Sequence, residues 1–278
     1  MKHIHLNLKR FDIKKEYGGV NTNEDLNQWA SSIIEASEDE LKMIASEKDV
    51  EFSMYFPEIH LLNAINARKD SESFSIGCQG VYEEDSSVGG NFGAFTSHRT
   101  GNSMRQAGVD SVIIGHLEER LGLKNILREG SVSDFSSVNR ILNKRVKKAV
   151  ESGLKVLFCI GETLEERDNW KEVLKEAIEV GLDGIGRDNV IIAYEPAWAI
   201  GPGKIPPTSQ EIKEIVDYIK TIDKDLEVLY GGGLKKDNAK DLSKIDSLDG
   251  GLIALTRFSG DIGFYTDEYL EIIREFLY

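Results

Sequence analysis

Short apolar runs alternate along the whole chain with longer segments of mixed polarity, and this alternation limits the possible folds more than any other feature. Each run is rich in Val, Ile, Leu or Phe, as is typical of buried strands. We expect strands at residues 4–9, 50–56, 74–79, 111–115, 154–160, 190–193, 226–230 and 250–254. Helical spacing of apolar residues predicts helices at 24–48, from Pro57, at 136–151 with a stop near Gly153, after Trp170, at 209–222 with Ser209 as cap, and from Asp267.

A strand followed by a helix, repeated about eight times, is typical of an α/β protein with a parallel sheet. In a chain of 278 residues, eight such units fit a closed (β/α)8 barrel better than an open sheet. No shift in composition marks a second domain. We therefore predict one barrel domain that spans residues 1–278.

The charge of the chain excludes some classes of partner. Its net charge of −14 argues against nucleic acid and against anionic membrane surfaces. A small anionic substrate stays possible, because a local site can be positive on an acidic protein. No apolar run approaches the roughly 18 residues of a membrane span, and residues 1–7 have no apolar signal region. Cys78 and Cys159 lie in strand-like runs without metal-binding spacing, so we expect reduced core thiols, no metal and a cytoplasmic protein.

Polar residues follow several of the expected strands. In a (β/α)8 barrel the carboxyl ends of the strands share one face, where active sites are built. A carboxylate there suits a general base, an imidazole can polarise a carbonyl, and a lysine with a glycine-rich turn can hold an anion. Each residue alone also has an ordinary explanation: a structural histidine, a solvated lysine or a tight turn. The residues in question are Asn7, Lys9, Gln79, His116, Glu162, Glu195 and the glycines at 231–233.

The segment 194–204 combines a carboxylate with a flexible stretch. Glu195 ends a strand, and Pro196 stops the ladder because it has no N–H to donate. The following apolar residues end in Gly201-Pro202-Gly203, which can swing as a lid and exclude water. The alternative is an ordinary loop with an exposed acid.

This eleven-residue string resembles the flexible catalytic loop of the triosephosphate isomerase family. Other motifs extend the resemblance over nearly the whole chain: Asn7-Leu8-Lys9, Gly93-Ala94-Phe95-Thr96, Gly115-His116-Leu117-Glu118-Glu119-Arg120, Cys159-Ile160-Gly161-Glu162 and Tyr230-Gly231-Gly232.

The resemblance implies a TIM barrel, a cofactor-free aldose–ketose isomerase of glycolysis and gluconeogenesis, and a homodimer in which the third loop reaches the neighbouring subunit. The implied substrates are dihydroxyacetone phosphate and glyceraldehyde 3-phosphate, interconverted through an enediolate. It further implies that Glu195 is the base, His116 the electrophile and Lys9 the electrostatic partner. The expected contacts to the phosphorylated sugar are Asn7, Lys9, Gly201, Gly232 and Gly233.

Several positions depart from the family pattern. Pro202 replaces a threonine, Gly233 replaces a serine whose hydroxyl binds phosphate, and Ala254-Leu255 replaces a glycine pair. Arg257 is either a compensating phosphate contact or a surface residue. These departures keep two alternatives open: the same chemistry on a four-carbon ketose phosphate such as an erythrulose phosphate, and a non-catalytic barrel that binds a phosphorylated metabolite.

One further departure concerns assembly. The family usually has an acidic residue at the position of His98 and a basic one at the position of Glu119, so both signs are reversed here. We therefore expect a His98–Glu119 contact across a two-fold interface, with two unrelated surface residues as the alternative.

Overall fold

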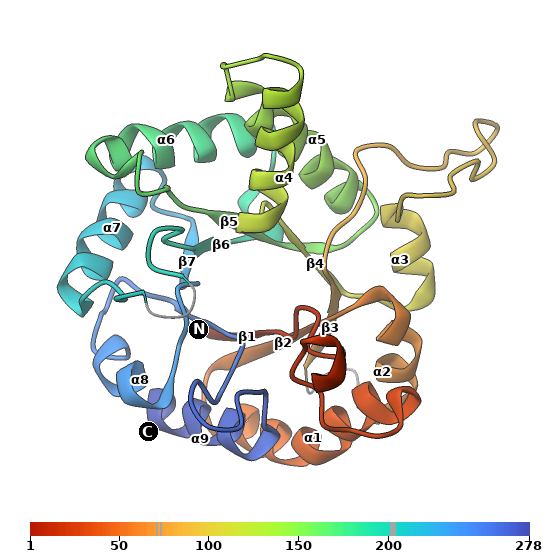
Figure 1. Ribbon diagram of the computed structural model, residues 1–278, viewed down its shortest axis with the longest axis vertical. Helices are drawn as coiled ribbons and strands as arrows, with labels where there is room; N and C mark the ends of the chain where they lie inside the picture. Colours follow the sequence, from red (N-terminus) through yellow and green to blue (C-terminus); the bar gives the residue numbers. More distant parts are fainter. Residues whose placement is uncertain (71, 73, 201–203) are drawn as a thin grey trace.

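The eight strands pair in sequence order and the first pairs with the last, so that they close into a parallel barrel (Figure 1). This computed structural model describes residues 1–70, 72, 74–200 and 204–278. The closed ring of eight parallel strands confirms the predicted (β/α)8 barrel. The strands are β1 (Lys2–Asn7), β2 (Val50–Phe56), β3 (Ser75–Cys78), β4 (Ser111–Ile114), β5 (Lys155–Ile160), β6 (Val190–Tyr194), β7 (Glu227–Tyr230) and β8 (Gly250–Ile253).

Helices surround the barrel on its outside (Figure 1). They are α1 (Trp29–Glu47), α2 (Leu61–Ala67), α3 (Gly101–Ala107), α4 (Leu117–Glu129), α5 (Ser136–Glu151), α6 (Trp170–Gly181), α7 (Ser209–Ile222), α8 (Lys236–Leu242) and α9 (Thr266–Leu277). Single 3-10 turns are η1 (Lys15–Tyr17), η2 (Leu26–Gln28), η3 (Glu58–His60), η4 (Arg167–Asn169) and η5 (Arg187–Asn189). None of the helices in the described part of the chain has the length and apolar character needed to cross a bilayer.

Successive side chains of a strand point to opposite faces of the barrel wall. The core therefore has two layers, one inside the barrel and one between the barrel and the helices. In β5, Phe158 and Ile160 belong to the layer between barrel and helices, whereas Leu157 and Cys159 point into the barrel. Cys78 and Cys159 are both buried and free, as expected for core thiols. The inner layer consists of Tyr55, Ile113, Leu157, Cys159, Ala193, Leu229 and Leu252, with Ile191 packed against it.

Some element boundaries differ from the sequence-based expectation. The first helix begins at Trp29 rather than at residue 24, after the 3-10 turn η2. Helix α7 begins at Ser209, but its cap is Thr208, whose hydroxyl accepts a hydrogen bond from the Glu211 N–H at 3.2 Å. The Glu211 carboxylate accepts in return from the Thr208 N–H at 2.8 Å. This reciprocal pair gives hydrogen-bond partners to the N–H groups of Thr208 and Glu211 at the start of the helix.

Two segments extend away from the barrel wall in Figure 1: the loop between β3 and α3, and helix α4 with the turn that follows it. Helix α4 buries none of its residues fully. The loop exposes apolar side chains, since Phe92 is 90% exposed and Val88 is fully exposed. The sequence pattern does not indicate α3, α4 or α8, because their apolar residues are too few or too weakly periodic.

Candidate active site

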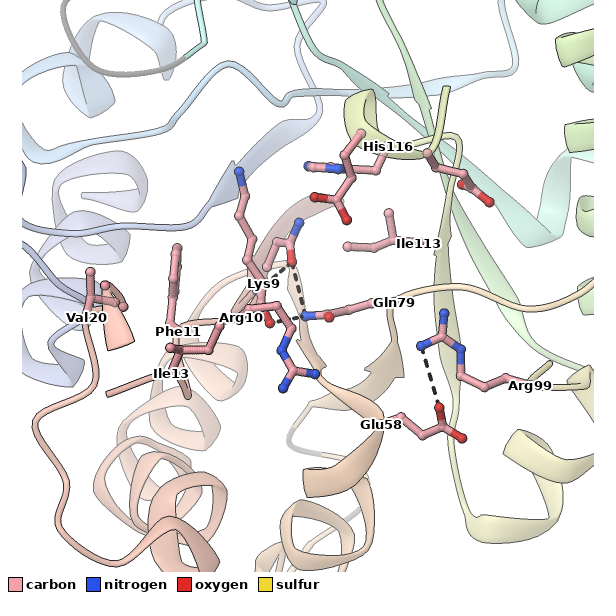
Figure 2. A pocket seen from close by; sticks show the side chains of 15 residues that line it. Lys9, Arg10, Phe11, Ile13, Val20, Glu58, Gln79, Arg99, Ile113 and His116 are labelled. Carbon is pink, nitrogen blue, oxygen red and sulfur yellow. Dashed lines mark hydrogen bonds and ion pairs between the residues drawn. The ribbon is translucent and has the colours of Figure 1, made fainter. Parts of the chain in front are cut away.

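Lys9 follows β1 in a backbone conformation that lysine rarely adopts, with φ of 42°. Two neighbours hold it there: the Asn7 side-chain oxygen accepts a hydrogen bond from the Lys9 N–H at 3.0 Å, and Gln79 Nε2 donates to the Lys9 carbonyl at 2.9 Å. Such left-handed conformations cost about 1–3 kcal/mol and persist where the surroundings impose them. The strain turns the lysine side chain into the opening above the barrel (Figure 2).

His116 and Glu195 meet at the carboxyl ends of β4 and β6. His116 Nε2 lies 3.6 Å from Glu195 Oε1, too far for a good hydrogen bond but within ion-pair distance. The other carboxylate oxygen accepts a hydrogen bond from the Leu117 N–H at 3.2 Å. Because this donor is backbone, the leucine at 117 supplies it as well as any residue would. Glu195 is only 4% exposed, so its carboxylate is held in a largely dry position.

Two glycines allow the strand ends to close around Glu195. A Cβ added at Gly161 would lie 1.8 Å from the Glu195 carbonyl oxygen, and one at Gly231 would lie 2.7 Å from Glu195 Cγ. Neither position can accept a side chain without displacing the acid. The Gly231 N–H also donates to the Tyr194 carbonyl at 2.7 Å, which fixes the turn beside Glu195.

Glu162, at the end of β5, anchors the segment that follows Glu195. It is fully buried, and its Oε1 accepts hydrogen bonds from Trp198 Nε1 at 2.8 Å, Tyr194 Oη at 3.1 Å and Arg167 Nη1 at 2.9 Å. The Ala197 N–H donates to the Glu162 carbonyl at 3.1 Å. The start of the expected lid is therefore tied to the neighbouring strand. Gly201, an expected substrate contact, lies outside the described residues.

The glycine turn after β7 and the residues after β8 offer backbone donors. Within the described part of the chain, the N–H groups of Gly232, Gly233, Ala254 and Leu255 donate no hydrogen bond. Convergent free N–H groups form a concave site for an anion. The side chains of Ala254 and Leu255 therefore do not take away the backbone donors at these positions.

The side chain of Arg257 binds Glu268 of α9 and the neighbouring Tyr265 ring. Its Nε and Nη2 both donate to Glu268 Oε1 of α9, at 2.9 and 2.5 Å, and its guanidinium stacks 3.9 Å from the centre of the Tyr265 ring. In this arrangement Arg257 holds the turn after β8 against α9. The side chain is 38% exposed, and the choice between a surface residue and a phosphate contact stays a prediction that Arg257→Ala tests.

A cavity of about 480 Å³ opens at this end of the barrel. Asn7, Lys9 and His116 line it together, so three expected site residues share one opening (Figure 2). Arg10 and Arg99 extend the lining, and sequence analysis did not predict either of them. Gln79 also lines the cavity; its place at a strand end was visible in the sequence, but its contact with Lys9 was not.

The buried thiol of Cys159 lies next to this site. Burial, and secondarily the negative charge of Glu195, raise the pKa of Cys159 well above its usual value. The thiol therefore stays neutral and adds no second charge beside the acid. Among the described residues, no cluster of three or more His, Cys, Asp or Glu side chains is placed to hold a metal ion.

Known proteins resemble the chain over most of its length. The family model described as triosephosphate isomerase matches residues 20–274. The triosephosphate isomerase of Alkaliphilus metalliredigens is 31% identical over 248 residues, which cover 84% of this chain and 90% of that protein. The triosephosphate isomerase of Leptospira interrogans is 33% identical over 217 residues, covering 72% and 79%. The crystal structure of triosephosphate isomerase from Bartonella henselae superimposes with a TM-score of 0.71 at 25% identity, covering 99% of this chain and 98% of that one.

Proposed function

Because the chain belongs to the triosephosphate isomerase family, we propose that it interconverts dihydroxyacetone phosphate and glyceraldehyde 3-phosphate through an enediolate. Its relatives are isomerases, which favours an enzyme over a non-catalytic barrel. The observation that carries the proposal is the placement of Glu195 Oε1 3.6 Å from His116 Nε2, at the face where Lys9 enters the same opening as His116.

Each side chain has a step in the proposed reaction. Glu195 removes a proton from the carbon next to the substrate carbonyl and returns it to the neighbouring carbon. His116 polarises the carbonyl oxygen, and Lys9 stabilises the negative charge that develops on it. This pairing of carboxylate and histidine is the one known for triosephosphate isomerases, and it is carried over to this chain by resemblance. The reaction moves only protons, so the proposal includes no cofactor.

The substrate's phosphate is assigned to the donors beside the base. Gly232 and Gly233 follow Gly231, where an added Cβ would lie 2.7 Å from Glu195 Cγ, and their N–H groups are free within the described part of the chain. Asn7 acts through Lys9, whose backbone it holds at 3.0 Å. We include Gly201 as a further contact on the resemblance alone.

A four-carbon ketose phosphate is the second candidate substrate. Two observations favour it: Ala254 and Leu255 replace the family's glycines, and the cavity continues past His116 to Arg10 and Arg99. A coupled assay with triose and tetrose phosphates in parallel separates the two. Lys9→Met serves as the control, because it removes the charge from the site and should lower any turnover that takes place there, with either substrate. Faster turnover of the tetrose phosphate would reject the triose assignment.

The proposal places residues 1–278 in one catalytic domain of a cytoplasmic homodimer. The exposed Phe92 and Val88 on the extended loop support an interface, since large apolar side chains at a loop tip gain by burial. Glu119 already binds Arg145 Nη1 at 2.5 Å and the Gly115 N–H at 2.6 Å within its own subunit. The His98–Glu119 contact therefore stays a prediction, for which a double-mutant cycle on dimer dissociation is the test. Sedimentation as a monomer with full activity would reject the dimer.

A further inference from the structure

Lys235 lies beside the glycine turn that follows β7. It caps α8, two residues after Gly233, and its side chain folds back over the turn: a Cβ added at Gly233 would lie 3.4 Å from Lys235 Cε. Its ammonium nitrogen is 3.9 Å from the centre of the Phe258 ring. The cation is thus held at the end of β7, over the backbone that carries free N–H donors.

The charge of Lys235 is not neutralised. Across the described residues, no carboxylate lies within 4.0 Å of its ammonium group, although the chain has a net charge of −14 and many of its lysines are paired. The adjacent Lys236 shows the contrast, since its ammonium group binds Glu271 at 2.8 Å on α9. An aromatic face attracts a cation without cancelling its charge. Phe258 therefore positions Lys235 and leaves it able to bind an anion.

Phe258 is itself held in place by the turn after β8. Arg257 and Gly263 form an antiparallel bridge, and the Tyr265 N–H donates to Thr256 Oγ1 at 2.9 Å. The ion pair of Arg257 with Glu268 ties this turn to α9. The turn therefore presents the ring to Lys235 from a fixed support.

We propose that Lys235 binds the phosphate of the substrate, together with the N–H groups of Gly232 and Gly233, and that it contributes to specificity for phosphorylated sugars. The inference rests on the proposed function. A Cβ added at Gly231 would lie 2.7 Å from Cγ of the base Glu195, and Gly233 lies at most about 7 Å farther along the chain. That span matches the length of a three- or four-carbon sugar phosphate. Lys235 supplies a side-chain contact at a turn where Gly233 has no hydroxyl to offer.

The test compares Lys235→Gln with Lys236→Gln, which removes the same charge from the neighbouring exposed residue. We expect Lys235→Gln to raise the KM for glyceraldehyde 3-phosphate and the inhibition constant of inorganic phosphate about tenfold, with kcat changed only a few fold. Lys236→Gln should change neither constant. Lys235→Arg should restore both, because it returns the charge. Phe258→Leu should also raise the KM and the inhibition constant of phosphate, because it removes the ring that positions Lys235. Phe258→Tyr keeps a ring and should raise neither.

A second measurement keeps this inference separate from the proposed reaction. Binding to the folded state raises the melting temperature, so inorganic phosphate should stabilise the wild type and Lys236→Gln more than Lys235→Gln. If the wild type does not turn over triose phosphate but this difference is present, the proposed function fails and the role of Lys235 stands. Equal stabilisation of Lys235→Gln and the wild type, or no stabilisation of the wild type, would overturn the role of Lys235.

Discussion

Substituting Gly231 by alanine should impair catalysis by moving Glu195. The added methyl group would lie 2.7 Å from Glu195 Cγ and 3.0 Å from the Tyr194 carbonyl oxygen. Carbon atoms in contact are normally about 3.5–4.0 Å apart, so about 1 Å of separation is missing. The methyl group cannot retreat, because the Tyr194 carbonyl is already close and the Gly231 N–H is bonded to it. The acid must therefore shift by about 1 Å.

The size of the effect follows from this displacement. A shift of 1 Å in a catalytic group costs about 100-fold in rate, which corresponds to about 2.7 kcal/mol in the activation barrier. The shift also stretches the hydrogen bond from the Leu117 N–H, which is already 3.2 Å long. We expect kcat to fall about 100-fold and KM to change little. Crowding of this kind lowers stability by about 1–3 kcal/mol, so the variant should still fold.

The assay is steady-state kinetics on the triose phosphate, with a thermal melt to show that the variant is folded. Gly186→Ala is the matched control, because a Cβ at that glycine would meet no atom within 4 Å. A folded Gly231→Ala enzyme with kcat close to that of the wild type would show that Glu195 either does not move or is not the base.

Three other predictions concern the base, the barrel interior and the turn after β8. Glu195→Gln removes the basic group and Glu195→Asp retracts it, so kcat should fall about 10²–10⁴-fold in a folded protein; normal turnover would exclude this residue as the base. Burial, with the charges of His3 and Lys155 adding to it, lowers the pKa of His5 to about 3, so between pH 6.5 and about pH 3 the unfolded chain binds a proton that the folded chain does not. The unfolding free energy measured in urea should therefore decrease by about 1.4 kcal/mol per pH unit as the pH falls from 6.5 toward about 3, and a stability independent of pH in that window would contradict the argument. Arg257→Ala should lower the melting temperature through loss of the Glu268 pair, while a change in the inhibition constant of phosphate as large as that of Lys235→Gln would instead place Arg257 in the site.

The strand ends could be predicted from the sequence because a buried parallel strand has a simple signal. An apolar run followed by a polar or glycine residue marks the catalytic face, and this pattern predicts that His116 and Glu195 lie on the same face; the structure places them 3.6 Å apart. The boundaries of β2 and α5 were also predicted, since both elements end where the apolar pattern ends.

The remaining features depend on contacts between distant residues, which no local pattern encodes. The strained backbone of Lys9 is supported by Gln79, which is 70 positions away in the chain. The ion pair of Arg257 with Glu268 was not predicted, because no local pattern links the turn after β8 to a side chain on the following helix. Helix α4 was missed for a different reason: it buries no residue fully, so its sequence carries little of the periodicity that reveals a packed helix.

The pairing of β1 with β8 also determines when the site can form during synthesis. His3 pairs with Gly250 and Leu6 with Ile253, so the ring stays open until nearly the entire chain has left the ribosome. Lys9 lies on one side of this seam and the glycine turns on the other. A nascent chain that already carries His116 and Glu195 therefore still lacks the closed ring that brings Lys9 and the glycine turn to one face. Until β8 is in place, the edges of β1 and β7 lack the partner strand that they have in the closed ring.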